Sequence, residues 1–239
     1  MSYDVNDVAV AGARKLTQLD FIANNLANIS TNGFKSEHLY YAIKGREAQE
    51  GARSDLGRTS TSIDFTQGTV QRTGNPLDVA IEGDGFFAIE QNNGAITYTR
   101  NGGFVTNKNK ELVTKSGAKV LGESGQKIVI NGSQINIDVD GTIRVDGNLA
   151  GKLKIVSFTS PSQLTRAAEG HYMDDGNAGL KKSITSRVSG GYLETSNVNA
   201  MKEMVEMIEG HRSFESYQKI IQTMSDLDKI STNRIGKLA

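Results

Sequence analysis

The chain contains several short segments whose residue types imitate cofactor-binding motifs. Gly83-Asp-Gly85-Phe-Phe-Ala88 matches the dinucleotide fingerprint G-x-G-x-x-A, which requires a helix N-terminus beside it to hold a pyrophosphate. The residues that follow instead continue a β pattern, so the segment predicts a tight hairpin. Residues 147–152 imitate a phosphate-binding P-loop, but the segment is one residue short. Leu153 also stands where the magnesium-binding Ser or Thr is required.

The residues that could bind a metal do not stand at the spacings of known metal-binding motifs. Residues 138–141 begin like a calcium loop, yet the glycine stands at position four instead of six, so a hairpin is the better interpretation. The pair Asp174-Asp175 lies in a polar segment typical of a solvated turn. His38, His171 and His211 form no H-E-x-x-H pattern. The chain has no cysteine, which excludes disulfides, thiolate zinc sites and cysteine nucleophiles. We therefore predict no catalytic residue, no metal site, no cofactor and no small-molecule substrate.

The net charge of the chain argues against two classes of binding partner, nucleic acids and anionic membranes. The 239 residues include 27 Lys+Arg and 27 Asp+Glu, and a chain without net charge offers no broad surface for nucleic acid or anionic lipid. No apolar run approaches the roughly 18 residues that would span a bilayer. The N-terminus lacks the basic and apolar regions of a secretory signal. We expect no nucleic-acid partner, no membrane embedding and, outside the cytoplasm, export without a cleaved signal peptide.

Glycine separates the ends of the chain from its middle. All glycines except Gly12, Gly210 and Gly236 lie between residues 33 and 191, and glycine is costly within helices but natural in turns. The ends are therefore predicted to be helical and the middle turn-rich. Gly210 is expected to weaken the C-terminal helix by about 1 kcal/mol relative to Ala.

Apolar residues at spacings of three and four predict one helix at each end. Asp4 is expected to cap the first helix, and Asn32-Gly33 to stop it. Ser196 or Asn197 is expected to cap a second helix of about 36 residues. A pattern this long favours a coiled coil, although two amphipathic helices that pack on their own domain fit it equally well. The first pattern comprises Val5, Val8, Gly12, Leu16, Leu19, Ile22, Leu26 and Ile29, and the second Val198, Met201, Val205, Ile208, Phe214, Tyr217, Ile221, Met224 and Leu227.

The middle of the chain reads as β structure. Asn131-Gly132, Asp140-Gly141 and Asp146-Gly147 are strong hairpin signals. The absence of crossover helices predicts antiparallel pairing, and hence an α+β fold. The expected segments are an N-terminal helix (1–35), an extended connection (36–75), a β-rich domain (76–190) and a C-terminal helix (191–239). The expected strands are residues 77–81, 85–89, 96–100, 111–114, 127–130, 135–139, 142–145 and 152–158.

Four ordered segments resemble one known family. Residues 21–35, FIANNLANISTNGFK, resemble the N-terminal signature of the bacterial flagellar rod and hook proteins, the axial family. Residues 78–89, residues 98–122 and residues 191–215 resemble, in order, the opening of the family's β domain, its next hairpins and its C-terminal signature. The short length indicates a rod protein. The short stretch between residues 35 and 78 favours the proximal rod type over the distal type.

The resemblance implies a structural subunit, not an enzyme. Its two end helices would pair as an inner coiled-coil domain, with the β domain outside. The subunit would assemble helically with copies of itself and other rod proteins in the basal body, in the periplasmic space, and help transmit torque from motor to hook. Export would use the flagellar export apparatus. The competing hypothesis, from another class, is a secreted enzyme or binding module with an unrecognised site in the β domain.

The expected assembly interface combines both apolar patterns with an asparagine cluster. The asparagines are expected to bond to neighbouring chains or to the turn that ends at Gly33, and the alternative is that they solvate one helix face. The interface residues are Val5, Val8, Leu19, Ile22, Asn24, Asn25, Leu26, Asn28, Ile29, Val198, Met201, Met204, Val205, Ile208, Phe214, Tyr217, Ile221 and Met224.

Overall fold

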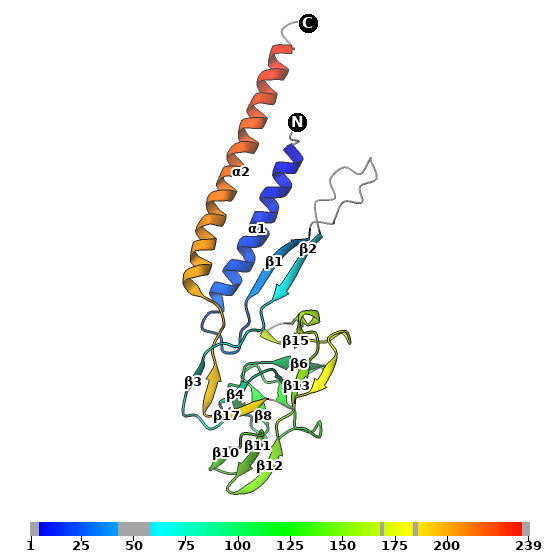
Figure 1. Ribbon diagram of the computed structural model, residues 1–239, viewed down its shortest axis with the longest axis vertical. Helices are drawn as coiled ribbons and strands as arrows, with labels where there is room; N and C mark the ends of the chain where they lie inside the picture. Colours follow the sequence, from blue (N-terminus) through cyan, green and yellow to red (C-terminus); the bar gives the residue numbers. More distant parts are fainter. Residues whose placement is uncertain (1–4, 43–57, 168–169, 184–185, 236–239) are drawn as a thin grey trace. The chain divides into compact units, whose positions relative to one another are not determined.

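The computed structural model describes residues 5–42, 58–167, 170–183 and 186–235 (Figure 1). The chain divides into two compact units, each built from segments that are remote in the sequence. The first unit comprises residues 1–27, 37–62 and 199–239, and the second comprises residues 28–36 and 63–198. Residues 43–57, in the middle of the expected connection, lie outside the described residues.

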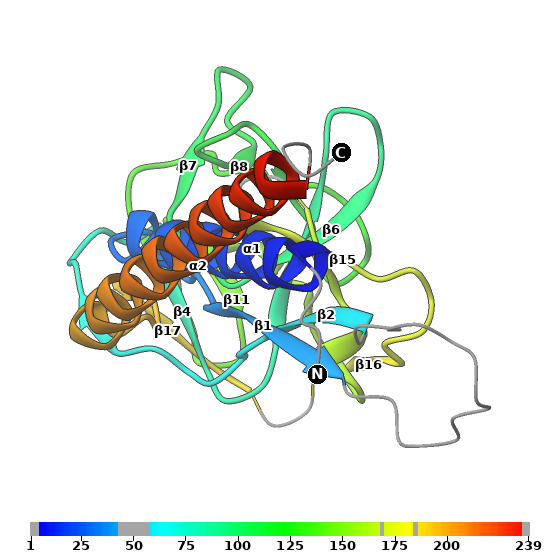
Figure 2. The same ribbon diagram turned by 90° about the horizontal axis from the view of Figure 1, so that it is seen from above.

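The first unit contains two helices and a two-stranded sheet. Helix α1 (Val5–Ala27) and helix α2 (Ala200–Ile235) pack side by side (Figures 1 and 2). Strand β1 (Glu37–Ala42) pairs with β2 (Arg58–Ile63), and β1 also contacts α1. The predicted helices are confirmed, and α2 has the expected 36 residues. Helix α1 ends at Ala27, before the expected stop, and the turn that follows reaches Gly33, which has φ +68°.

Asn199 caps α2, so the prediction of Ser196 or Asn197 was wrong. The Lys202 N–H donates to Asn199 Oδ1 at 3.2 Å, which is the usual bond from the third helical residue to the cap. The two predicted caps are engaged elsewhere. Ser196 Oγ accepts from the Val198 N–H, and the Asn197 side chain bonds to the backbone of the second unit.

Two glycines set the approach of α1 and α2. A Cβ at Gly12 would lie 3.6 Å from Tyr217 Cβ, in ordinary contact. A Cβ at Gly210 would lie 2.6 Å from Leu19 Cδ2 and 3.2 Å from Leu19 Cγ, which is closer than atoms pack. Gly210 therefore provides the space into which Leu19 fits. The sequence-based view of Gly210 as a weak point is incomplete, because it counts helix propensity without this contact.

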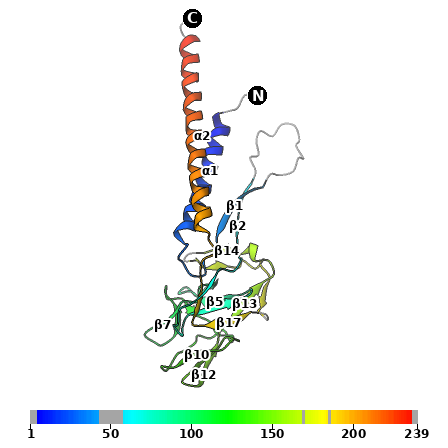
Figure 3. The ribbon, with the colours of Figure 1, turned by 60° about the vertical axis from the view of Figure 1, so that its left-hand side comes forward.

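The second unit is a β-rich body in which every strand pair is antiparallel, as predicted. A nine-stranded sheet has the order β14-β15-β6-β5-β9-β8-β7, with β13 joined to β5 and β16. Beside it are a three-stranded sheet, β10-β11-β12, and the pairs β17-β4 and β18-β3 (Figure 3). The strands are β3 (Val70–Arg72), β4 (Val79–Glu82), β5 (Phe86–Glu90), β6 (Ile96–Thr99), β7 (Phe104–Thr106), β8 (Leu112–Thr114), β9 (Lys119–Val120), β10 (Ile135–Ile137), β11 (Thr142–Val145), β12 (Asn148–Lys152), β13 (Ile155–Phe158), β14 (Thr165–Arg166), β15 (Tyr172–Met173), β16 (Leu180–Lys182), β17 (Arg187–Gly190) and β18 (Tyr192–Glu194), with a 3-10 turn at Pro161–Gln163.

The turn signals were correct at two of the three expected hairpins. Asp140-Gly141 joins β10 to β11, and Asp146-Gly147 joins β11 to β12. The latter two residues have φ of 50° and 82°, as the favoured two-residue hairpin turn requires. The dinucleotide-like segment at residues 83–88 is a turn between β4 and β5 followed by β5 itself. The strand was expected, but the prediction of a tight hairpin was wrong, because β4 pairs with β17 and β5 pairs with β6, β9 and β13.

The prediction of a hairpin at Asn131-Gly132 was wrong. Residues 127–130 form only isolated bridges, to Glu111 and Leu121, so no strand precedes the turn. The glycine has another role. A Cβ at Gly132 would lie 2.0 Å from Asp146 Oδ2, and Asp146 accepts the backbone N–H of Gln134 at 2.9 Å. Glycine is required at position 132 because the Asp146 carboxylate lies where a side chain would be, and not because the residue forms a hairpin turn.

Strand β5 contributes to both hydrophobic clusters of the second unit. Phe87 and Ile89 belong to one cluster, and Phe86 and Ala88 to the other, because successive strand side chains point to opposite faces. Phe86 makes edge-to-face ring contacts with Phe158 at 5.6 Å between centroids.

Within the described part of the chain, neither helix combines the length and the apolar character that crossing a membrane would need.

Candidate assembly site

An apolar stripe runs along the first turns of α2. It comprises Met201, Met204, Val205 and Ile208, whose side chains are 75, 47, 52 and 55% exposed. These residues stand at positions i, i+3, i+4 and i+7, so they share one side of the helix. Glu203 and Gly210, which are also seven residues apart, are buried, and they lie on the opposite side. The stripe therefore faces away from α1.

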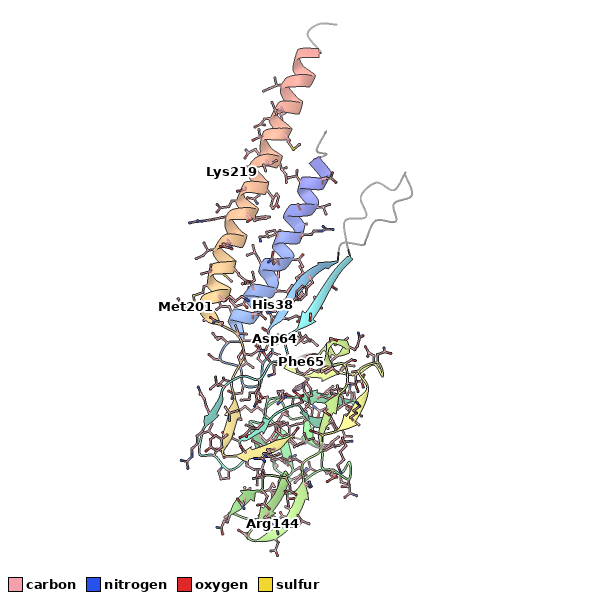
Figure 4. All side chains as sticks on the ribbon, in the orientation of Figure 1. His38, Asp64, Phe65, Arg144, Met201 and Lys219 are labelled. Carbon is pink, nitrogen blue, oxygen red and sulfur yellow. The ribbon has the colours of Figure 1, made fainter. Side chains whose placement is uncertain are left out.

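Charged residues follow the apolar stripe on the same side of α2. Arg212, Glu215 and Lys219 continue the same spacing and are exposed. Figure 4 labels Met201, within the stripe, and Lys219, beyond it. An apolar surface of limited length with a charged border is typical of a protein contact site.

The other predicted interface residues fall into two groups. Leu19, Ile22 and Asn25 are buried, so in this conformation they are covered by their own chain and not available to a neighbour. The half-buried residues are Val8, Leu26, Asn28, Ile29, Val198, Phe214, Tyr217, Ile221 and Met224, whereas Asn24 is exposed. The side chain of Val5 lies outside the described residues.

Two members of the asparagine cluster, Asn25 and Asn28, form hydrogen bonds within the chain. The Asn25 side chain donates to the Glu37 carbonyl at 3.0 Å and to Glu203 Oε1 at 3.3 Å, and it accepts the Glu37 N–H at 3.0 Å. This amide joins α1, β1 and α2. Asn28 Oδ1 accepts from the Thr31 hydroxyl at 3.2 Å, which agrees with the expected bond to the turn that ends at Gly33.

A buried ion network lies in the second unit, and sequence reasoning missed it. It consists of Lys35, Arg100 and Glu194, each at most 3% exposed. Lys35 Nζ lies 2.5 Å from Glu194 Oε1, and Arg100 Nη1 lies 3.4 Å from Glu194 Oε2. Lys35 also donates to the Thr66 carbonyl at 2.6 Å. The Gly68 N–H donates to Glu194 at 2.9 Å. Thus one carboxylate serves two cations.

Burial dominates the electrostatics of this network. Desolvation lowers the pKa of Lys35, and the charge and hydrogen bond of Glu194 raise it in opposition. Desolvation likewise lowers the pKa of Arg100, with Glu194 again the largest opposing influence. Glu194 is therefore the largest favourable influence on both cations in a dry setting. The three side chains are closed off from solvent, so we interpret the network as stabilising the fold.

The network brings together three of the sequence segments that resemble the axial family. Lys35 ends the first segment, Arg100 lies within residues 98–122, and Glu194 lies in the last. The backbone supports the same junction. The Gly33 N–H donates to the Glu194 carbonyl at 2.8 Å. A Cβ at Gly33 would lie 2.4 Å from the Arg100 carbonyl carbon, so only glycine fits there.

Asn197 completes the junction between the two ends of the chain. Its Nδ2 donates to the Asp64 carbonyl at 2.8 Å, and its Oδ1 accepts the Ser36 N–H at 2.8 Å. Its own N–H donates to the Phe34 carbonyl at 3.3 Å. The sequence does show charged and amide residues inside the segments that resemble the axial family. It does not show which of these residues contact one another in the folded chain.

Metal coordination finds no support among the residues that the structure describes. They include no group of three or more His, Cys, Asp or Glu side chains that could hold an ion. The segment at residues 138–141 is the β10–β11 turn, and Asp140 Oδ2 accepts from Lys152 Nζ at 3.0 Å. That bond is the largest of the influences that lower the pKa of Asp140 to about 2.

Comparisons with known proteins match three stretches of the chain. Residues 11–35 match the family "Flagella basal body rod protein", residues 80–145 match "Flagellar hook protein FlgE/F/G D1 domain", and residues 189–235 match "Flagellar basal body rod FlgEFG protein C-terminal". The flagellar basal-body rod protein FlgG of Buchnera aphidicola (from Acyrthosiphon pisum) is 37% identical, over 89% of this chain and 92% of the relative.

Relatives of the second rod type match over a larger share of both chains. The flagellar basal-body rod protein FlgF of Caulobacter vibrioides is 31% identical over 98% of this chain and 99% of its own length. FlgF of Escherichia coli is 33% identical over 95% of both. The chain belongs to the flagellar basal-body rod protein family, whose members are structural subunits of the rod and not enzymes.

Proposed function

We propose that this rod subunit assembles helically through the apolar stripe of α2 and helps to transmit torque from motor to hook. The stripe is the observation that carries the proposal. Its four side chains are about half exposed or more, and α1 packs on the opposite side of α2. A contact between two different faces of the same subunit repeats without closure and builds a filament. Neighbouring subunits would thus cover apolar surface that the single chain leaves in water.

The two end helices would form the inner domain of the rod as a coiled coil, with the β-rich body outside. By the domain bounds expected from the sequence, residues 1–35 and 191–239 would supply the inner segments and residues 76–190 the outer domain. Residues 28–35 and 191–198 belong to the compact β-rich unit, so the helical part of each inner segment would be α1 or α2. Among the sequence-predicted interface residues, the exposed and half-buried ones would contact neighbours. The buried Leu19, Ile22 and Asn25 would hold the helix pair together.

The proximal rod position fits this chain better than the distal one. The relatives named FlgF align over 95% or more of both chains, whereas the relative named FlgG from Buchnera aphidicola aligns over 89% of this chain. Its higher identity, 37%, keeps the distal type as the alternative. In either position the subunit would pass through the flagellar export apparatus without a cleaved signal and reside in the periplasmic part of the basal body.

Cysteine cross-linking in basal bodies tests the proposal directly, because the natural chain has no cysteine. Ile208→Cys places a thiol in the apolar stripe, and Lys219→Cys places one on the same side of α2 beyond it. A bis-maleimide, which alkylates one thiol at each end, or oxidation to a disulfide by copper phenanthroline can join two cysteines. Ile208→Cys combined with single cysteines placed along neighbouring subunits should then give cross-linked rod proteins. Lys219→Cys is the matched control, because position 219 is also exposed but lies outside the apolar stripe. It shows how much cross-linking arises from solvent exposure alone.

Two results would contradict the proposal. If Ile208→Cys cross-linked no better than the control, the stripe would not be an assembly surface. If purified basal bodies lacked this protein, the position in the rod would itself be wrong. A strain lacking the protein should stop at an incomplete rod, and motility that survived the deletion would count against a role in torque transmission.

A further inference from the structure

The junction of α1, β1 and α2 contains a buried carboxylate with one unused oxygen. Glu203 is 2% exposed, and its Oε1 accepts a hydrogen bond from Asn25 Nδ2 at 3.3 Å. Its Oε2 is buried, and the described residues supply no hydrogen-bond partner for it. An ionised carboxylate needs donors at both oxygens to offset its lost hydration. Within the described part of the chain, the Glu203 carboxylate accepts one hydrogen bond, from Asn25.

No charged side chain of the described residues forms an ion pair with Glu203. From β1, His38 attracts the carboxylate without forming an ion pair with it. From α2, Glu206 repels Glu203 and Lys202 attracts it more weakly, while Lys202 Nζ lies 3.8 Å from Glu206 Oε1. From α1, the contacting side chain is the neutral Asn25. Burial is therefore the largest influence and raises the pKa of Glu203, while the hydrogen bond from Asn25 lowers it in opposition.

We propose that Glu203 is a proton-binding site that controls how firmly the β1–β2 hairpin is held to the helix pair. Asn25 is the link, because the amide that donates to Glu203 also bonds to both backbone groups of Glu37 at 3.0 Å. A two-stranded sheet is marginally stable by itself, so β1 depends on such an anchor. Protonation removes the buried charge and closes the junction.

Ionisation of Glu203 has the opposite effect. An unpaired anion in a buried position favours opening of the junction to water, and opening breaks the bonds between Asn25 and Glu37. The ordinary pKa of glutamate is 4.5. Because the pKa in the closed state is raised, the closed state binds more protons between 4.5 and that raised value. The closed junction is therefore most stable below pH 4.5 and loses stability as pH rises through this window.

Carbon-13 NMR of the full chain tests the proposal without any substitution. The Glu203 carboxyl resonance should titrate above the ordinary glutamate value. Hydrogen exchange of the Glu37 amide, corrected for its intrinsic pH dependence, should report opening of the junction. The opening constant should rise with pH within the window, by at most about tenfold per pH unit for one proton.

Two substitutions on the same helix complete the test. Glu203→Gln keeps the shape but cannot ionise, so exchange at Glu37 should lose its pH dependence. Glu206→Gln is the matched control, since Glu206 is only half-buried. It should keep a pH dependence at Glu37, displaced towards lower pH because the Glu206 charge helps to raise the pKa of Glu203. Titration of Glu203 at or below the ordinary value would overturn the proposal, even if Glu203→Gln failed to fold. An unchanged pH dependence in a folded Glu203→Gln protein would overturn it as well.

Discussion

Substitution of Glu194 by Gln removes the only anion of the buried ion network while keeping the shape of the side chain. Lys35 and Arg100 then remain in a dry position without the carboxylate that lies 2.5 and 3.4 Å from them. Removing one partner of a buried ion pair costs about 3–5 kcal/mol, because the remaining charge is uncompensated. We expect a loss of this size for Glu194→Gln, which is a large part of a typical stability of about 5–15 kcal/mol.

The loss has an upper bound because Lys35 can release its proton. Burial already lowers the pKa of Lys35, and removal of Glu194 lowers it further. The folded protein then binds fewer protons than the unfolded chain in the window between that lowered pKa and the ordinary 10.5, so stability rises with pH there. The defect of Glu194→Gln should therefore become smaller at alkaline pH.

Urea unfolding of the purified chain, followed by circular dichroism at several pH values, measures both effects. Glu123→Gln is the control, because its partner Lys182 is 73% exposed and such surface pairs contribute little. Glu194→Gln combined with Lys35→Met removes one stranded cation and should be less destabilised than the single variant. A Glu194→Gln protein within about 1 kcal/mol of wild type at neutral pH would refute the view that this carboxylate holds two buried cations.

Three further predictions follow from local contacts. Gly210→Ala should destabilise the helix pair by about 1 kcal/mol, because overpacking against Leu19 (about 1–3 kcal/mol) outweighs the gain in helix propensity of about 1 kcal/mol. Thermal unfolding measures this, and stabilisation would contradict it. Ile208→Asp should leave folding intact, since the side chain is 55% exposed, but abolish swimming in soft agar; normal swimming would remove the stripe from the assembly surface. Asp140, with a pKa of about 2 held down by Lys152, should stabilise its hairpin fully above pH 4 and lose that effect as pH falls towards 2. In Asp140→Asn this loss should be absent from amide NMR spectra.

Both helices and seven of the eight expected strands formed as predicted, because their signals are local. Other strands, among them β1–β3 and β14–β18, were not predicted. The α2 helix has its expected 36 residues, since apolar spacing and the scarcity of glycine act within a few turns. The hairpins at Asp140-Gly141 and Asp146-Gly147 formed as predicted, because positive φ is a property of the turn residues themselves. The family could be recognised for a similar reason, as its signatures are continuous stretches of sequence.

Other features depended on partners far away along the chain. Asn131-Gly132 carries a hairpin signal, yet the glycine is there because the Asp146 carboxylate passes beside it. Ser196 and Asn197 are both good caps by type, but their side chains are engaged elsewhere, and Asn199 caps the helix instead. Gly210 is unfavourable by propensity alone and acquires a function only when Leu19 packs against it.

The buried ion network shows the same limit most clearly. The sequence alone places Lys35 and Glu194 in two segments that resemble the axial family, one near each end of the chain. Their meeting, across 159 positions of sequence, was decided by the folding of the β body between them. A charged residue type by itself predicts exposure. Only the tertiary structure could bury these charges, because it alone supplies the opposite charge and the backbone carbonyls that replace water.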